Sequence, residues 1–260
     1  MLEYIDSHAH YDDSAFDSDR ELLLPQLHKN GVLNIINIGC SEKSCASSAA
    51  LADKYDFIYF AAGIHPDEAG SMSDSFRDTV KKYASHKKCA AIGEIGLDYH
   101  YDGYDRSKQI ALFEMQLEIA AEYCLPVVIH TRDAWQDTMD ILKKYRPKGV
   151  VHCYSGSAET AEEIVNLGMY IGFTGVLTFK NAKKAVKSAE VIPLSRILVE
   201  TDCPYMAPEP FRGTRCDSGM ITEVIKKGAE IKKISPEEFA AATVSNTRRL
   251  FPCLENVNKY

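Results

Sequence analysis

The chain has 260 residues, of which 45% are hydrophobic and 26% charged, a composition typical of a globular protein. No apolar run approaches the ~20 residues that a membrane-spanning helix needs, so we expect no membrane association. The formal net charge of -7 argues against a generally basic surface that binds nucleic acid by charge alone.

The eight cysteines are scattered without a CxxC pair, and we see no cleavable signal peptide. These features predict reduced thiols in a cytoplasmic protein. No low-complexity segment or Pro/Gly/Ser-rich linker divides the sequence, so we expect residues 1–260 to form a single domain. Nothing in the sequence indicates a stable protein partner.

Short apolar runs alternate with helical patterns along the whole chain. The first strand ends in the segment 5–10, and an acidic loop follows over 12–19. The other predicted strands cover 32–39, 57–63, 89–94, 127–130, 149–152, 169–173 and 197–200. The predicted helices cover 20–29, 41–55, 74–86, 105–123, 134–145, 158–167, 181–191, 219–233 and 236–249.

The predicted strands are nearly continuous apolar runs, which indicates a parallel sheet buried on both faces. Eight strand-helix repeats with short connections are typical of an α/β protein with the (β/α)8 TIM-barrel fold. An open doubly wound sheet is the alternative. The absence of GxGxxG after the first strand weakens a dinucleotide-binding version of that alternative.

A His-x-His pair lies at the end of the first strand. Alternate side chains of a strand point to the same face, so His8 and His10 can direct two nitrogens at one divalent metal ion. Two unrelated surface histidines are about as plausible for the pair alone, because this spacing is common. The later strands decide between the two interpretations.

Chemically active residues recur where the predicted strands end, and a barrel of this kind has its active site at the C-terminal ends of its strands. One histidine on an apolar strand is more often a core residue. A set of five with two carboxylates is hard to explain in that way, because buried polar groups need partners. The residues after His8 and His10 are His65, Glu94, His130, His152 and Asp202.

Nitrogen and carboxylate ligands without thiolates are typical of a catalytic metal site rather than a closed structural one. The set is larger than one ion needs, and Glu94 lies where it can bridge two ions. We therefore expect two divalent cations, with magnesium, manganese and zinc all left open. Cys153 and Cys203, beside ligands, are interpreted as packing residues.

Six motifs resemble the TatD family of metal-dependent deoxyribonucleases in order and spacing, from about Leu2 to Leu250. The motifs are Asp-Ser-His-Ala-His at 6–10, Gly-Ile-His-Pro at 63–66, Gly-Glu-Ile-Gly-Leu-Asp-Tyr at 93–99, Pro-Val-Val-Ile-His at 126–130, His-Cys-Tyr-Ser-Gly at 152–156 and Glu-Thr-Asp-Cys-Pro at 200–204. The resemblance implies a TIM-barrel hydrolase related to the amidohydrolase superfamily.

The resemblance also implies roles for individual residues. His8, His10, Glu94 and Asp202 hold one ion, and Glu94 holds the second together with two histidines. Those histidines are His130 and His152. Asp202 orients or deprotonates the nucleophilic water.

The same resemblance makes His65 a group that faces the substrate phosphate. Arg132 and Arg212 are predicted phosphate contacts, and Tyr154 a contact for a base, although such aromatic rings more often pack in the core. The loop 211–218 keeps Arg212 and Gly213 of the family pattern but has Cys216 and Ser218 where Asn and Pro are usual, which leaves substrate preference open.

Three functions follow from these features. The first is a 3′–5′ exonuclease on single-stranded DNA. The second is a metal-dependent hydrolase of a small phosphoester, ester, lactone or amide; Glu94, at a position where many amidohydrolases have a carboxylated lysine, modestly favours phosphoester chemistry. The third, a non-catalytic barrel, predicts missing ligands, whereas every ligand position is filled.

Overall fold

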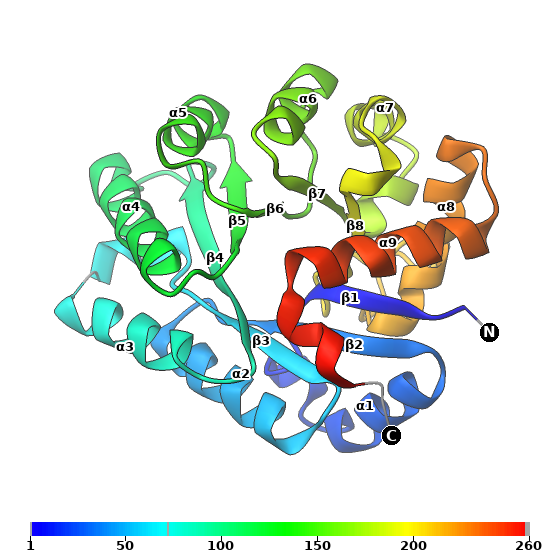
Figure 1. The fold of residues 1–260 in the computed structure, drawn as a ribbon, viewed down its shortest axis with the longest axis horizontal. Helices are drawn as coiled ribbons and strands as arrows, with labels where there is room; N and C mark the ends of the chain where they lie inside the picture. The colour runs from blue at the N-terminus through cyan, green and yellow to red at the C-terminus, as the bar shows by residue number, and fades with distance from the viewer. Residues whose placement is uncertain (1, 72, 258–260) are drawn as a thin grey trace.

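The computed structural model describes residues 2–71 and 73–257, so residues 1, 72 and 258–260 of the predicted domain lie outside the described ranges. Its centre is a sheet of eight strands in the order β1 to β8, with all neighbours parallel and helices around it (Figure 1). A parallel bridge from Ala9 to Cys203 brings the first strand next to the segment after the last. The predicted (β/α)8 barrel is confirmed.

The strands are β1 (Tyr4–Ala9), β2 (Val32–Ile38), β3 (Ile58–Ala62), β4 (Cys89–Asp98), β5 (Val127–Arg132), β6 (Gly149–Val151), β7 (Tyr170–Phe173) and β8 (Ile197–Val199). The α-helices are α1 (Arg20–Lys29), α2 (Glu42–Lys54), α3 (Asp74–Ala84), α4 (Arg106–Glu122), α5 (Trp135–Tyr145), α6 (Ala158–Asn166), α7 (Lys183–Val191), α8 (Ile221–Lys232) and α9 (Pro236–Leu250). The 3-10 helices are η1 (Ser14–Phe16), η2 (Pro66–Ser71), η3 (Gly175–Thr178), η4 (Leu194–Arg196), η5 (Ser218–Met220) and η6 (Pro252–Val257).

Most predicted boundaries differ from the structure by no more than two residues, and three differences change the type or extent of an element. The expected acidic loop contains η1, because the Asp13 side chain accepts a hydrogen bond from the Ala15 amide and caps the turn. Strand β4 continues to Asp98 instead of ending at Glu94. The helix expected to begin at Gly219 begins as the 3-10 turn η5 and becomes α-helical at Ile221.

Apolar side chains fill two separate layers. The larger layer lies between the strands and the helices, and the smaller one fills the barrel interior. Neighbouring strand residues alternate between them, as in β2, where Ile35 belongs to the larger layer and Ile36 to the smaller. Burial on both faces explains why the strands are continuously apolar.

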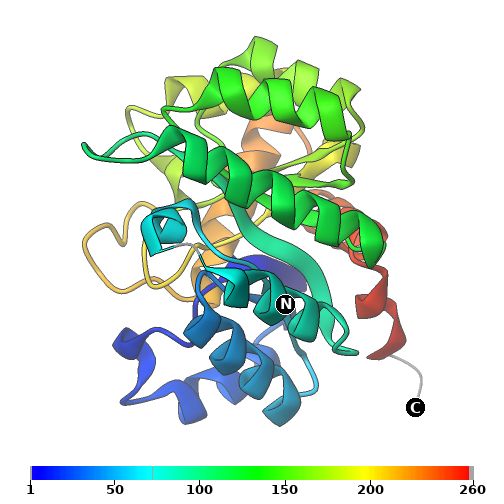
Figure 2. The ribbon, with the colours of Figure 1, turned by 90° about the vertical axis from the view of Figure 1, so that its left-hand side faces the viewer.

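The two ends of the barrel differ. At the end where the strands begin, Leu250, Phe251 and Leu254 pack into the interior layer, and α9 packs against β1 and β8. At the opposite end lie η2 and the loops that follow β4 and β8, which Figure 2 shows on the same side of the molecule, away from α9. The cavity that contains His10, Glu94 and Asp202 opens at this second end. Among the described residues, no helix is long and apolar enough to cross a membrane.

Candidate metal centre

Strand alternation aims most of the site residues inward. Val128 and Val150 belong to the interior layer, and two residues later on the same strand faces come His130 and His152. Leu198 also faces the interior, and Glu200 and Asp202 follow it at the same spacing. Along these three strands, the side chains that face the interior therefore change from apolar to ionisable within two to four residues.

The first strand reaches the same result through an irregularity. Ile5 lies in the interior layer, so strict alternation would turn Ser7 inward and His8 outward. The pairing of β1 with β2 shifts register between Asp6 and Ala9. After this shift both His8 and His10 face the interior, and their Nε2 atoms lie 3.1 Å apart. The predicted common direction of the two rings is confirmed.

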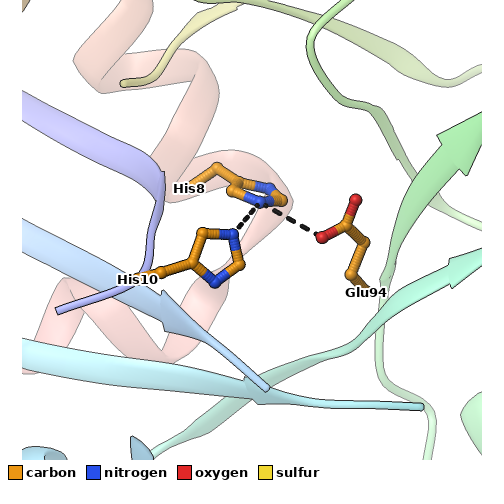
Figure 3. Close-up of side chains that lie close together, drawn as sticks. All are labelled: His8, His10 and Glu94. Atoms are coloured by element: carbon orange, nitrogen blue, oxygen red, sulfur yellow. Dashed lines mark hydrogen bonds and ion pairs between the residues drawn. The ribbon is translucent and has the colours of Figure 1, made fainter. Parts of the chain in front are cut away.

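One group of ligand atoms gathers around His8 (Figure 3). The Nε2 atom of this ring lies 3.5 Å from Glu94 Oε2 and 3.5 Å from Asp202 Oδ1. His10 Nε2 is 3.3 Å from the same Asp202 oxygen. Asp202 has a φ of 61°, a left-handed conformation that is costly for a residue with a side chain and that is concentrated at functional sites.

The second oxygen of Glu94 faces another group. Its Oε1 atom lies 2.8 Å from His130 Nδ1, 2.5 Å from His152 Nε2 and 4.0 Å from His65 Nε2. The His8 and His152 rings stack at 4.0 Å, which holds the two groups side by side. Glu94 thus faces both groups, with one carboxylate oxygen directed at each.

The outward nitrogens of two rings face hydrogen-bond acceptors. His10 Nδ1 lies 3.2 Å from the Ile38 carbonyl, and His130 Nε2 lies 3.1 Å from Asp98 Oδ2. In the third ring, His152 Nδ1 is 3.9 Å from the buried carboxylate of Glu200, which is beyond hydrogen-bond distance. An acceptor at the outer nitrogen fixes the tautomer and leaves the inner nitrogen with its lone pair, as metal ligation requires.

Burial and charge set the protonation of the centre. Burial alone would raise the pKa of Glu94, but His152, His130 and His8 hold that pKa well below its ordinary value. Burial and the neighbouring His152 lower the pKa of His8 to about 4 despite Glu94. Burial opposes protonation of His130 as well, yet hydrogen bonds to Asp98 and Glu94 raise its pKa to about 10. Near neutral pH Glu94 is therefore ionised and His8 is neutral, whereas burial raises the pKa of Glu200 to about 7.

These residues fit divalent cations. Three groups have ligand atoms within 4.8 Å of one another: His8, His10 and Glu94; His8, His152 and Asp202; His65, Glu94 and His130. The donors are imidazole nitrogens and carboxylate oxygens, which suit a catalytic ion with an open position. Two buried nitrogens, His8 Nδ1 and His152 Nδ1, have no hydrogen-bond partner among the described residues.

The centre opens into a cavity of about 440 Å³ at the end of the barrel. Asp12, Asp13, Asp67 and Glu68 give the rim of this cavity an acidic character. His65 also lines the cavity, and its Nδ1 atom faces Asp67 at 3.4 Å. The predicted ligands and His65 are thus brought together around one opening.

The predicted substrate contacts lie farther out. Arg132 is exposed and places its guanidinium 5.3 Å from the Tyr101 ring, and Arg212 covers Phe179 at 3.9 Å. Tyr154 is buried, and its hydroxyl donates to the Ser157 carbonyl at 2.6 Å. Its ring is therefore not available to a base, and the predicted contact between Tyr154 and substrate is not supported.

Sequence reasoning missed three residues of the centre: Asp98, Glu200 and Cys40. Asp98 lies four residues beyond Glu94, where the sequence predicts that the fourth strand ends. Glu200 was detectable, since it lies on the same strand face as Asp202. Cys40, whose Sγ is 3.6 Å from Glu94 Oε2, follows β2 and carries no spacing signal of its own.

Comparison with known proteins agrees with this geometry. The family described as TatD related DNase matches residues 5–252. The chain belongs to the TatD family. The uncharacterized metal-dependent hydrolase YabD of Bacillus subtilis (strain 168) is 39% identical over 249 residues, which cover 95% of this chain and 98% of YabD. This TatD-family chain is accordingly a metal-dependent hydrolase.

Two further relatives of the TatD-family chain bear on fold and function. The crystal structure of YjjV, the TatD homologue from Escherichia coli K12, superposes with a TM-score of 0.90 at 33% identity and covers 96% of this chain and 98% of YjjV. The protein named 3′-5′ ssDNA/RNA exonuclease TatD from Cronobacter sakazakii is 31% identical over 246 residues, which cover 92% of this chain and 94% of that protein. The fold is thus shared with YjjV, and YabD is named as a metal-dependent hydrolase.

Proposed function

We propose that this TatD-family protein is a deoxyribonuclease that removes nucleotides from the 3′ end of single-stranded DNA, with two divalent cations at the cluster of histidines and carboxylates. Residues 1–260 act as one hydrolase domain in this proposal, since every ligand lies on a strand of one sheet or within three residues of a strand's end. The name of the Cronobacter relative supports the substrate class.

The observation that carries the two-ion proposal is the division of the Glu94 carboxylate between two sets of nitrogens. Oε2 faces His8 at 3.5 Å, and Oε1 faces His130 and His152 at 2.8 and 2.5 Å. A carboxylate with this arrangement can bridge two ions. His8, His10 and Asp202 complete the first set, and His130 with His152 completes the second.

Divalent cations held in this way supply a lower pKa for an attacking water and charge stabilisation for the phosphoryl oxygens. Asp202 lies at the inner wall, 3.3 Å from His10, where its carboxylate orients the attacking water and accepts its proton. His65 lies at the edge of the cavity and contacts the scissile phosphate. Glu94 holds the two sets of ligands side by side, with one carboxylate oxygen facing each set.

Charge explains why phosphate contacts belong to the outer rim. The carboxylates of Asp12, Asp13 and Asp67 repel a phosphate unless cations occupy the centre. Arg132 and Arg212 are exposed cations beyond this acidic rim. In the part of the chain that the structure describes, the Arg132 guanidinium lies against Tyr101 and the Arg212 guanidinium against Phe179, and we infer that both can contact DNA phosphates. The free state of all eight cysteines fits a cytoplasmic location.

The deciding experiment measures cleavage of 5′- and 3′-labelled single-stranded DNA with added magnesium, manganese or zinc. Wild-type protein is compared with Glu94→Gln and with Glu118→Gln, a matched control on the exposed face of α4. We expect metal-dependent shortening from the 3′ end by wild type and the control, and loss of it in Glu94→Gln. Metal-loaded protein that leaves DNA intact but hydrolyses a small phosphodiester, ester, lactone or amide would contradict the proposal.

A further inference from the structure

A second cavity adjoins the metal centre. It has a volume of about 320 Å³ and lies between η2 and the loop that connects β4 to α4. We call it the side pocket; its walls include Pro66, Asp67, Asp98, Tyr101, Tyr104 and Gln109. Asp67 also lines the main cavity, and Asp98 contacts His130 at 3.1 Å. A molecule in the side pocket is therefore a direct neighbour of the metal centre.

The side pocket has aromatic walls that are open to solvent. Tyr101 is 62% exposed and Tyr104 is 45% exposed, and both lie on the loop after β4 that projects beside η2 in Figure 2. Tyr104 stacks on Tyr99 with ring centroids 4.5 Å apart and an interplanar angle of 8°. Large exposed aromatic rings beside an active site indicate a binding surface. A ring that a neighbouring ring or guanidinium holds in place can stack against a planar ligand.

The charges of the side pocket exclude a phosphate as its occupant. Asp67, Asp98, Asp102 and Asp105 line it, and its described walls include no Lys or Arg. Carboxylates accept hydrogen bonds from exocyclic amino groups, such as N4 of cytosine.

A cation lies at the outer edge of the same pocket. The Arg132 guanidinium is 5.3 Å from the Tyr101 ring centroid, with one NH group 3.4 Å from the Tyr101 hydroxyl. Arg132 ends β5, the strand that also carries His130. A DNA strand whose base stacks against Tyr101 would thus have its backbone phosphate near Arg132 and an adjacent phosphodiester at the metal centre.

We propose that the side pocket is a base-binding subsite, which holds one unpaired nucleobase by stacking on Tyr101 and Tyr104 and favours bases with an exocyclic amino group over thymine. This inference rests on the proposed nuclease function and adds a substrate requirement to it. A volume near the lower end of the ~300–1,000 Å³ range of small-molecule sites suits a single planar ring system. Paired DNA cannot enter, because its bases are stacked within the duplex.

The test uses two substrates, a labelled single-stranded heptanucleotide and the small diester bis(p-nitrophenyl) phosphate. Tyr101→Leu removes the ring but keeps an apolar side chain, and Tyr101→Phe keeps the ring. We expect Tyr101→Leu to reduce kcat/KM for the oligonucleotide about tenfold through KM, Tyr101→Phe to restore it, and neither to change hydrolysis of the small diester. Thermal unfolding of both variants checks that the exposed loop substitution leaves the fold intact.

A series of heptanucleotides that carry one abasic position sharpens the result. Wild type should lose affinity, measured by fluorescence anisotropy, when the abasic site falls at one defined position, and Tyr101→Leu should lose this dependence. Cleavage by wild type without any effect of Tyr101→Leu or of the abasic series would overturn the subsite while leaving the nuclease intact. Binding that depends on Tyr101 without cleavage would support the subsite and refute the nuclease. Absence of both binding and cleavage would overturn both.

Discussion

The two ends of this barrel are built on the same strands and serve opposite purposes. In β5, Val128 packs in the apolar interior, and His130, the next residue on that strand face, contacts Glu94. Leu250, Phe251 and Leu254 fill the interior from the end where the strands begin. Charged groups replace apolar ones over a distance of two residues.

The difference shows which end of the barrel contributes stability and which end costs stability. The apolar end gains free energy from burial and holds the strands in place. The ionisable end buries Glu94, His8 and His152, which is costly unless the groups pair or hold cations. The barrel can tolerate these buried ionisable groups because the apolar end supplies stability. Substitutions at the two ends should therefore have separable effects on activity and on unfolding.

The largest expected effect is on activity at the ionisable end. Replacing Glu94 by Gln keeps the shape of the side chain but removes the charge shared by two sets of ligands. We expect kcat to fall roughly 1,000-fold, since the centre loses its bridging carboxylate. Single-turnover cleavage at saturating metal measures this. Activity within tenfold of wild type would show that Glu94 does not bridge, and Glu118→Gln is the matched control.

The apolar end should give the opposite pattern. Phe251 is fully buried in the interior layer, so Phe251→Ala should lower the free energy of unfolding by about 3–5 kcal/mol. At a temperature where the variant is folded, kcat should stay close to the wild-type value. Urea denaturation followed by circular dichroism gives the stability. Phe211→Ala, at a position that is 42% exposed, is the control and should change the stability little.

Much of the ionisable end can be predicted from the sequence, because the alternation of side chains along a strand is regular. Residues two apart on β5, β6 and after β8 share a face, so His130, His152 and Asp202 could be placed from spacing alone. The pair His8 and His10 was also placed correctly. The inward aim of His8, however, depends on a register shift in β1, which is a property of strand pairing that no local pattern reveals.

Other features can be recognised only in the three-dimensional structure. Asp98 reaches His130 only because β4 is longer than its apolar run suggests. Tyr154 belongs to a motif beside a ligand, but its ring turns into the core and packs edge to face on Trp135. Sequence position gives the neighbourhood of a side chain on a loop or strand end, whereas its direction depends on packing against segments far away in the chain.

Metal removal tests whether cations relieve the cost of the ionisable end. A chelator should lower the melting temperature of wild type by roughly 5–10 °C, the shift expected when a ligand at about 100 times its Kd contributes ~2.7 kcal/mol. The same treatment should move the melting temperature of Glu94→Gln much less, because that variant has lost the shared ligand. Differential scanning calorimetry with and without added manganese measures both. Equal shifts in the two proteins would mean that the stabilising ion binds elsewhere.

The smallest effect concerns the support of a ligand rather than the ligand itself. Asp98 faces the outer nitrogen of His130 at 3.1 Å, so Asp98→Asn keeps a hydrogen-bond acceptor but removes its charge. We expect metal affinity to fall about 10-fold, at the lower end of the 10–100-fold range for groups that orient a ligand, while the melting temperature of the metal-free protein changes little. Isothermal titration with manganese measures the affinity, and Asp102→Asn on the exposed loop is the control. An unchanged affinity would mean that His130 is held by packing alone, in which case the ionisable end would depend on the surrounding barrel more than on its own network of charges.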